Sequence, residues 1–360
     1  MNTLLADPRR RNLVVLAVAA IVTLLLAIVV VWQQSSSGES ASTSAQFFPG
    51  FAKQVRHAAH IHVVSKAGAF DVVFVPEKGW VVPERGNYPA SFDLVQRTLV
   101  GLAALQTIEP KTARPEWFHF VGLETPPKGD GIAITVGDDK GKELASLIAG
   151  KSEDIGDPTG AVGLFVRRPS ESQSWLTRSV LDPRAALTDW LDKTVMNVDR
   201  ARIRAADVSP ADNGPTYTVQ RLDPGKPDFT LTPLPPGKTV SDPTIADGIA
   251  AGITGFGFDD VQAASNLDFS GAGVAHITTL TFDGLKVTVN VLKSGADYWA
   301  TITAEADAEK PDAAKEAATI NAHAAGWAYK LPAWKGQLFM TTLDDLLKTP
   351  AAPAAPPTQP

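Results

Sequence analysis

An uninterrupted apolar run near the N-terminus constrains this chain more than any other feature. Leu13 to Val31 contains a single polar residue, Thr23, among Leu, Val, Ile and Ala. At about 1.5 Å per residue, a helix of this length spans a hydrocarbon core of roughly 30 Å. Backbone groups in lipid must bond within their own segment, so the run has to be helical. The sequence therefore predicts a transmembrane helix over residues 12–32, with Trp32 at the interface.

The flanking charges orient this helix. Three arginines at positions 9–11 precede the run, and residues 33–44 contain neither Lys nor Arg. The positive-inside rule then predicts a cytoplasmic stub, residues 1–11, with the main domain in the periplasm of a bacterial inner membrane. A cleaved signal peptide is the alternative, with Thr43-Ser44-Ala45 as a cleavage candidate. Its apolar region would normally span about 7–15 residues, so we favour the uncleaved anchor.

Composition limits the partners of the exterior part. Hydrophobic residues make up 44% of the chain and charged residues 20%, as in a globular protein with a sizeable core. The chain has no cysteine, hence neither disulfides nor a lipid-attachment cysteine. Its net charge is −6; residues 1–32 hold three Arg and one Asp, which leaves −8 outside. An acidic exterior argues against nucleic acid and against lying on anionic lipid.

The remainder is predicted to be an α+β protein built from two similar modules of antiparallel sheet with a packed helix. A Ser-rich flexible tether, 33–46, precedes a first module, 47–190. A second module with a closing helix follows at 191–349, and an Ala/Pro-rich tail, 350–360, is predicted to be disordered.

Hydrophobic periodicity gives each module the same order of elements: three strands, one helix, then further antiparallel strands. The first module has a helix from Phe92 to Leu105, capped near Ser91, and strands at 61–64, 70–75, 80–82, 132–136, 144–149, 163–167 and 174–176. The second has a helix that starts at Ser241-Asp242-Pro243, a closing helix over 311–326, and strands at 203–208, 216–221, 229–231, 276–282, 285–292, 298–304 and 327–331. The repeated order predicts a duplicated unit.

Several stretches also match a known family. They are Phe48-Pro49-Gly50-Phe51, Trp80-Val81-Val82, Tyr88-Pro89-Ala90, Glu109 to Pro115, Val121 to Pro126, Phe165 to Pro169, Trp190-Leu191-Asp192, Gly326 to Pro332 and Asp344 to Leu347. In this order they resemble the bacterial domain-of-unknown-function family numbered 4340, most specifically over Lys111–Pro126. The resemblance implies a membrane-anchored envelope protein, found in some relatives with gliding-motility-type ABC transporter components. It implies no activity and no catalytic residues.

Within Lys111–Pro126, backbone geometry accounts for the pattern. Pro115 is predicted to open a short helix and Gly122 to end it, with Trp117, Phe118 and Phe120 as core or rim aromatics.

His57, His60 and His62 form the single histidine cluster. Three imidazoles suit zinc or copper. The alternative is that His60 and His62 share one face of a strand as ordinary half-exposed residues. Because no carboxylate lies near them in the sequence, we favour the second interpretation and expect no metal and no cofactor.

Other catalytic patterns are weak. Gly252 to Gly257 follows a predicted helix, whereas phosphate loops precede one, so a helix end and turn is favoured over a nucleotide site. No Gly-x-Ser-x-Gly elbow is present, and His119, His276 and His323 lie in unrelated segments. The acidic pairs Asp259/Asp260 and Glu305/Asp307 are of a kind common on solvated faces. The sequence therefore favours a protein that is not an enzyme.

Binding remains. Arg167 and Arg168 lie close in sequence to Trp175, the composition of an interaction surface. The alternative is that Trp175 packs in the core while the arginines pair with Glu171 or other acids. The sequence predicts an accessory or scaffold subunit of an envelope assembly, such as an ABC-type transporter, with a membrane-protein partner. A ligand-binding module for a glycan or small envelope molecule is the second hypothesis.

Overall fold

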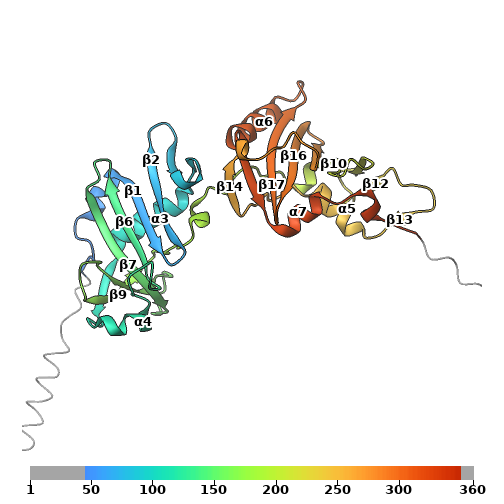
Figure 1. The fold of residues 1–360 in the computed structure, drawn as a ribbon. Coiled ribbons are helices and arrows are strands. Elements are labelled where there is room, and N and C mark those ends of the chain that lie inside the picture. The colour runs from blue at the N-terminus through green and yellow to red at the C-terminus, as the bar shows by residue number, and fades with distance from the viewer. Residues whose placement is uncertain (1–44, 350–360) are drawn as a thin grey trace, which may run out of the picture. The chain divides into compact units, whose positions relative to one another are not determined.

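The computed structural model describes residues 45–349 and contains two large antiparallel sheets with helices packed on them (Figure 1). The predicted α+β class is confirmed. The described chain divides into two compact units, the first made of residues 45–57, 97–134 and 144–183, and the second of 58–96, 135–143 and 184–349. The module boundary predicted between residues 190 and 191 stays a prediction.

The first sheet has nine strands in the order β4-β3-β2-β1-β6-β7-β8-β9-β5. Side chains alternate between its faces, as on β1, where Ile61 and Val63 are buried while His60 and His62 are half-exposed on the other face. Its strands are β1 (Ala58–Ser65), β2 (Gly68–Val75), β3 (Gly79–Val82), β4 (Tyr88–Pro89), β5 (Gln106–Pro110), β6 (Ile132–Asp138), β7 (Glu143–Glu153), β8 (Val162–Arg167) and β9 (Ser174–Ser179).

The second sheet has eight strands in the order β12-β11-β10-β15-β16-β17-β18-β14. Strand β16 buries every second residue, Leu285, Val287, Val289 and Val291, which form part of the core of the second unit. Its strands are β10 (Ile203–Ser209), β11 (Tyr217–Gln220), β12 (Thr230–Thr232), β14 (Asp260–Ala263), β15 (Val274–Thr281), β16 (Leu285–Ser294), β17 (Asp297–Ala306) and β18 (Trp327–Leu331). A separate ribbon pairs β13 (Thr239–Val240) with β19 (Leu347–Lys348).

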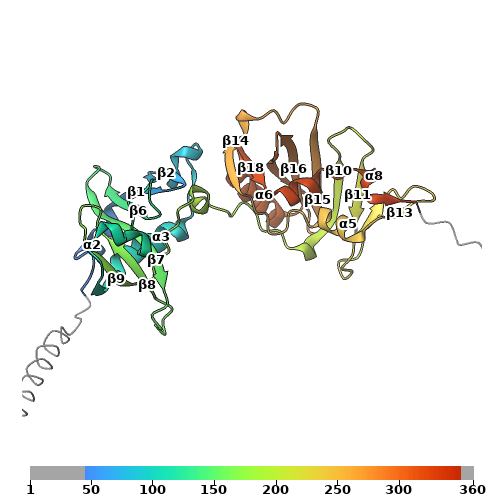
Figure 2. The ribbon, with the colours of Figure 1, turned by 60° about the horizontal axis from the view of Figure 1, so that its bottom comes forward.

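Helices cover the second sheet. Helix α6 (Pro311–Ala324) packs on β16 and β17, and α7 (Ala333–Phe339) packs on the same two strands. Helix α5 (Pro243–Ala250) lies against β10 and β11 (Figure 2). The other helices are α2 (Phe51–Gln54), α3 (Phe92–Ala104), α4 (Phe118–Val121) and α8 (Leu343–Leu346).

The predicted cap of α3 and the predicted helix end at Gly252–Gly257 are confirmed, and glycines close two of the hairpin turns. The Leu94 amide donates to Ser91 Oγ at 3.3 Å, so Ser91 caps α3. A turn closes at Gly141, whose amide donates to the Asp138 carbonyl, and Gly284, with φ of 92°, closes the turn between β15 and β16. Gly252–Gly257 follows the C-terminus of α5, as expected.

Other predictions fall on the rest of the chain. The transmembrane helix at 12–32, the tail at 350–360 and most of the tether lie outside the described residues. Between residues 45 and 349, no helix combines the length and the apolar character needed to cross a membrane.

Candidate interaction surfaces

Two aromatic rings protrude from the first unit next to one that is buried. Pro115–Trp117 forms a 3-10 turn that runs into α4, and Phe118 at the start of α4 is 6% exposed. Trp117 and Phe120 are 48% and 66% exposed. Gly122 ends the helix with φ of 67°, a left-handed conformation that favours glycine. We call Trp117 and Phe120 the α4 aromatic surface.

The buried side chain of Arg167 bonds to the segment that follows α4. Arg167 on β8 is 4% exposed; its Nε donates to the Leu123 carbonyl at 2.9 Å and its Nη2 to Thr125 Oγ1 at 2.6 Å. The guanidinium also lies over the Phe118 ring, 4.8 Å from its centroid. Burial lowers the pKa of Arg167, because the charged form is desolvated. The backbone that carries the α4 aromatic surface is therefore fixed on both sides of Gly122.

Basic side chains accompany both exposed rings. The Arg114 guanidinium lies 4.9 Å from the centroid of the Trp117 ring. The His119 and Phe120 ring centroids are 3.9 Å apart, and Lys151 Nζ donates to the Phe120 carbonyl at 2.9 Å. The surface thus combines aromatic area with positively charged groups, a composition typical of contact sites.

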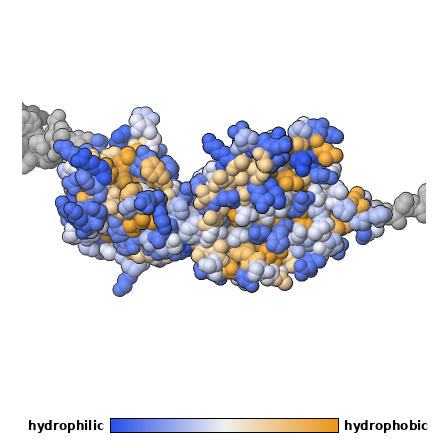
Figure 3. All heavy atoms as spheres, turned by 90° about the horizontal axis from the view of Figure 1, so that it is seen from above, coloured by the Kyte–Doolittle hydropathy of each residue, from blue (hydrophilic) through white to orange (hydrophobic). Residues whose placement is uncertain are grey.

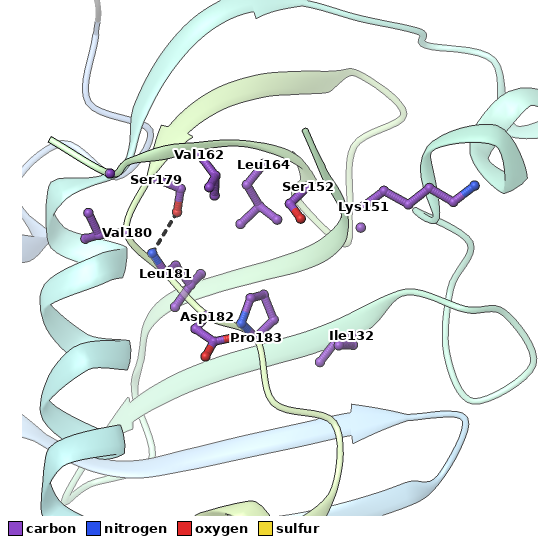
Figure 4. Close-up of a pocket in the computed structure, with 12 residues that line it drawn as sticks. Ile132, Lys151, Ser152, Val162, Leu164, Ser179, Val180, Leu181, Asp182 and Pro183 are labelled. Atoms are coloured by element: carbon purple, nitrogen blue, oxygen red, sulfur yellow. Dashed lines mark hydrogen bonds between the residues drawn. The ribbon is translucent and has the colours of Figure 1, made fainter. Parts of the chain in front are cut away.

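A hollow of about 720 Å³ lies beside this segment in the first unit (Figure 4). The pairing of β7 with β8 shifts register between Ala149 and Ser152, which leaves Gly150 and Lys151 opposite a single residue of β8, as in a bulge. The Leu181 amide donates to Ser179 Oγ at its wall. The Lys151 side chain extends away from the hollow in Figure 4, so the walls consist of aliphatic groups, serine hydroxyls and the Asp182 carboxylate.

The three residues of the predicted interaction surface, Arg167, Arg168 and Trp175, lie in three different environments. Arg167, at the end of β8, is buried and donates to the Leu123 carbonyl, so it adds little accessible area; the interaction surface itself stays a prediction. Arg168 pairs with Glu171 at 3.3 Å and donates to the Phe47 carbonyl at 2.6 Å. Trp175 is half-buried on β9, and its buried Nε1 has no hydrogen-bond partner among the described residues. The alternative pairing of Arg168 with Glu171 is confirmed.

The second unit exposes an aromatic side chain on α7. Trp334 is 64% exposed, while its neighbour Lys335 is 4% exposed. Lys335 Nζ lies 5.6 Å from the Trp334 ring centroid and 5.1 Å from that of Phe256. Gly336 packs directly against Tyr298. Helix α7 is thus fixed on the sheet with Trp334 pointing outward, and we call Trp334 the α7 aromatic surface.

Apolar groups gather in several patches between polar residues on the face that Figure 3 draws. Singly exposed apolar residues are normal on protein surfaces. The α4 and α7 aromatic surfaces differ from these because their tryptophan rings adjoin cations and their backbones are fixed by buried neighbours.

Lys335 makes the stability of the second unit sensitive to alkaline pH. Burial lowers its pKa from the ordinary value, so between the two pKa values the unfolded chain binds more protons than the folded one. The free energy of unfolding should therefore rise with pH in that window, up to about pH 10. Burial also lowers the pKa of Lys193 in the same unit, so we expect Lys335→Met to reduce this rise, leaving the part due to Lys193, in urea unfolding measured between about pH 8 and pH 10.

The pH range in which the free energy of unfolding rises must end near pH 10. Above it, the buried hydroxyls of Tyr88, Tyr217 and Tyr329 lower the free energy of unfolding as pH increases. Burial raises the pKa of each above its ordinary value, so the unfolded chain loses these protons first. Stability then falls as pH rises further. An identical pH dependence in Lys335→Met and the unaltered chain would contradict this role of Lys335.

The histidine cluster is only partly as expected. His60 Nε2 and His62 Nδ1 lie 2.9 and 2.6 Å from Oδ1 of Asp71, and both side chains are about two-fifths exposed, as the non-metal interpretation predicts. The expectation that no carboxylate lies near is wrong, since strand pairing places Asp71 opposite His62. His57 Nε2 instead accepts from Arg56 Nε. No group of three or more His, Asp or Glu is arranged to hold a metal ion within residues 45–349.

The other candidate residues are dispersed. His276 lies 2.7 Å from the Asn290 amide oxygen, and His323 offers its carbonyl to the Tyr329 hydroxyl. The acidic pairs contact bases: both Asp260 oxygens accept from Arg85, at 2.6 and 2.8 Å, and Glu305 pairs with Lys286 at 3.0 Å.

Neither aromatic surface was identified from the sequence alone. The spacing of Trp117, Phe118 and Phe120 indicated core or rim positions without deciding which ring is buried. Pro332 precedes α7 and is a signal for the start of a helix, but it does not indicate whether the Trp334 side chain is exposed.

Comparison with known proteins identifies the family of the chain. No curated protein and no solved structure matches the chain. The family described as "Domain of unknown function (DUF4340)" matches residues 80–271, more than half of the chain and a shorter range than the quoted motifs cover. That range includes the α4 aromatic surface and Arg167, whereas Trp334 lies beyond it. The chain belongs to the DUF4340 family.

Proposed function

We propose that this chain is a non-enzymatic, membrane-anchored accessory or scaffold subunit of an envelope assembly, such as an ABC-type transporter. In this proposal residues 12–32 form a single transmembrane helix, with the N-terminus in the cytoplasm and the main domain in the periplasm of a bacterial inner membrane. The apolar run from Leu13 to Val31 and the arginines at 9–11 support this placement.

We also infer that the fold arose from two similar modules. The element order supports this: β1, β2 and β3 precede α3 and a set of antiparallel strands, and β10, β11 and β12 precede α5 and a second such set.

One observation supports the scaffold proposal. Each compact unit has an aromatic surface that is exposed to solvent and whose backbone is fixed by buried neighbours. Trp117 and Phe120 occupy this position in the first unit and Trp334 in the second. Exposed Trp beside cations is typical of interface hot spots, and a fixed backbone lowers the entropic cost of binding. A subunit with two such surfaces is suited to hold neighbours together.

Trp334 is expected to contact a membrane-protein partner. Replacing Trp334 by alanine should remove the aromatic area and abolish recovery of that partner when the full-length chain is purified from crosslinked membranes. The measurement is identification of the co-purifying proteins by mass spectrometry. Phe92→Ala is the matched control, since Phe92 is 67% exposed in the same unit and should leave recovery unchanged.

A chain recovered alone from crosslinked membranes would contradict the scaffold proposal. It would favour the second hypothesis, a ligand-binding module, for which the hollow beside β7 and β8 is the candidate site.

A further inference from the structure

We infer that the α4 aromatic surface docks at the lipid–water interface of the bilayer that anchors the chain, with Trp117 and Phe120 in the headgroup region. This inference rests on the proposed membrane anchor. It assigns the surface of the first unit to lipid, and leaves the α7 aromatic surface to a protein partner.

The composition of the surface suits a bilayer interface. Tryptophan is enriched at the headgroup level, where an amphipathic ring lies between water and acyl chains. Arg114 lies over the Trp117 ring and Lys151 bonds to the Phe120 carbonyl. Long basic side chains beside inserted rings extend their charges to lipid phosphates while their aliphatic stems cover apolar area.

Local charge also fits a membrane carrying anionic lipid. The chain as a whole is acidic, with a net charge of −6. Around the α4 aromatic surface both signs of charge occur, and Lys111 is paired with Glu109, but the charged groups placed directly against the surface are the cations Arg114 and Lys151. Each basic group near an anionic membrane surface contributes attraction that salt weakens.

The chain length between anchor and fold permits this contact. The fold begins beside β5: the Phe47 amide donates to the Leu105 carbonyl, and Gln46 pairs with Gln106. Trp117 lies eleven residues after Gln106, so the two are at most about 40 Å apart. Thirteen residue steps from Trp32 to Ala45 reach up to about 45 Å. The anchor and the α4 aromatic surface can therefore meet the same bilayer.

The absence of cysteine from the sequence allows a clean test. A single cysteine introduced as His119→Cys, at an exposed position between the two rings, would carry an environment-sensitive dye on the full-length chain. The chain would be reconstituted in vesicles of phosphatidylethanolamine and phosphatidylglycerol with lipids bearing nitroxide quenchers. We expect strong quenching that weakens at high salt, and loss of quenching when Trp117→Ala and Phe120→Ala are added.

Leu222→Cys provides the matched control, because Leu222 is 83% exposed in the second unit and should show little quenching. Equal quenching at both positions, or none at position 119, would overturn the inference. Crosslinking of position 119 to a protein instead of lipid would also overturn it. Alkaline extraction separates the two proposals: a chain that washes off the vesicles contradicts the anchor, whereas an integrated chain with an unquenched dye contradicts only the docking.

Discussion

Gly336→Ala is expected to destabilise the second unit by about 3 kcal/mol or more, an effect at the upper end for overpacking. An added Cβ at this position would lie 2.1 Å from Cγ and 2.4 Å from Cβ of Tyr298. Tyr298 is 8% exposed on β17 and pairs with β16 and β18, so it has little room to shift. Chemical denaturation of the variant, with the free energy of unfolding as readout, measures the loss.

Gly248→Ala gives the matched control. Gly248 lies inside α5, and a Cβ there would meet Leu338 at 3.4 Å, an ordinary van der Waals contact. Alanine favours a helix interior over glycine by up to about 1 kcal/mol, so this variant should be as stable as the unaltered chain or more so. Equal destabilisation by both substitutions would show that the α7–β17 contact is not what restricts position 336.

A change in α7 should also affect binding. Because Gly336 sets the distance between α7 and the sheet, its substitution displaces Trp334, whereas Trp334→Ala removes only the ring. The two variants therefore separate loss of the fold from loss of the contact surface.

Periodicity predicted the longer elements well, because burial on one face repeats along a helix or strand. The helix predicted from Phe92 to Leu105 is α3, and the run predicted at 285–292 is β16 (Leu285–Ser294). The short strands β4, β5 and β14 were not predicted, although β3, β11, β12 and β18, which are of similar length, were. A segment of two to five residues completes too few periods to be distinguished reliably from a loop, and its pairing depends on partners distant in the chain.

The candidate site was harder to predict, because its contacts also depend on partners distant in the chain. His62 and Asp71 are nine residues apart, and only the register of β1 with β2 brings them together. The sequence shows Arg167 and Arg168 as equivalent neighbours, yet β8 ends at Arg167, so the strand fixes the direction of Arg167 and not that of Arg168. One became a buried donor and the other a partly exposed ion pair.

Arg167→Met is expected to lower the free energy of unfolding by about 3 kcal/mol or more. The substitution keeps an aliphatic stem but removes the donors to the Leu123 carbonyl and Thr125 Oγ1. It also removes the guanidinium over Phe118. A carbonyl left without a donor costs about 1–3 kcal/mol when buried, and Leu123 is fully buried. Urea denaturation gives the stability, and hydrogen exchange of residues 115–125 localises the change.

Arg168→Met serves as the matched control on the neighbouring residue. Its ion pair with Glu171 is partly exposed, and exposed pairs contribute about 1 kcal/mol or less. Its bond to the Phe47 carbonyl is part-buried, whereas that of Arg167 to the Leu123 carbonyl is fully buried, so the loss should be smaller than for Arg167→Met. If the two methionine variants lose equal stability, Arg167 does not hold the segment. If Arg167→Met speeds exchange at residues 115–125 and also abolishes quenching at position 119, the fixed backbone is a condition for bilayer docking. In that case Arg167 acts on binding only through the position of Trp117 and Phe120.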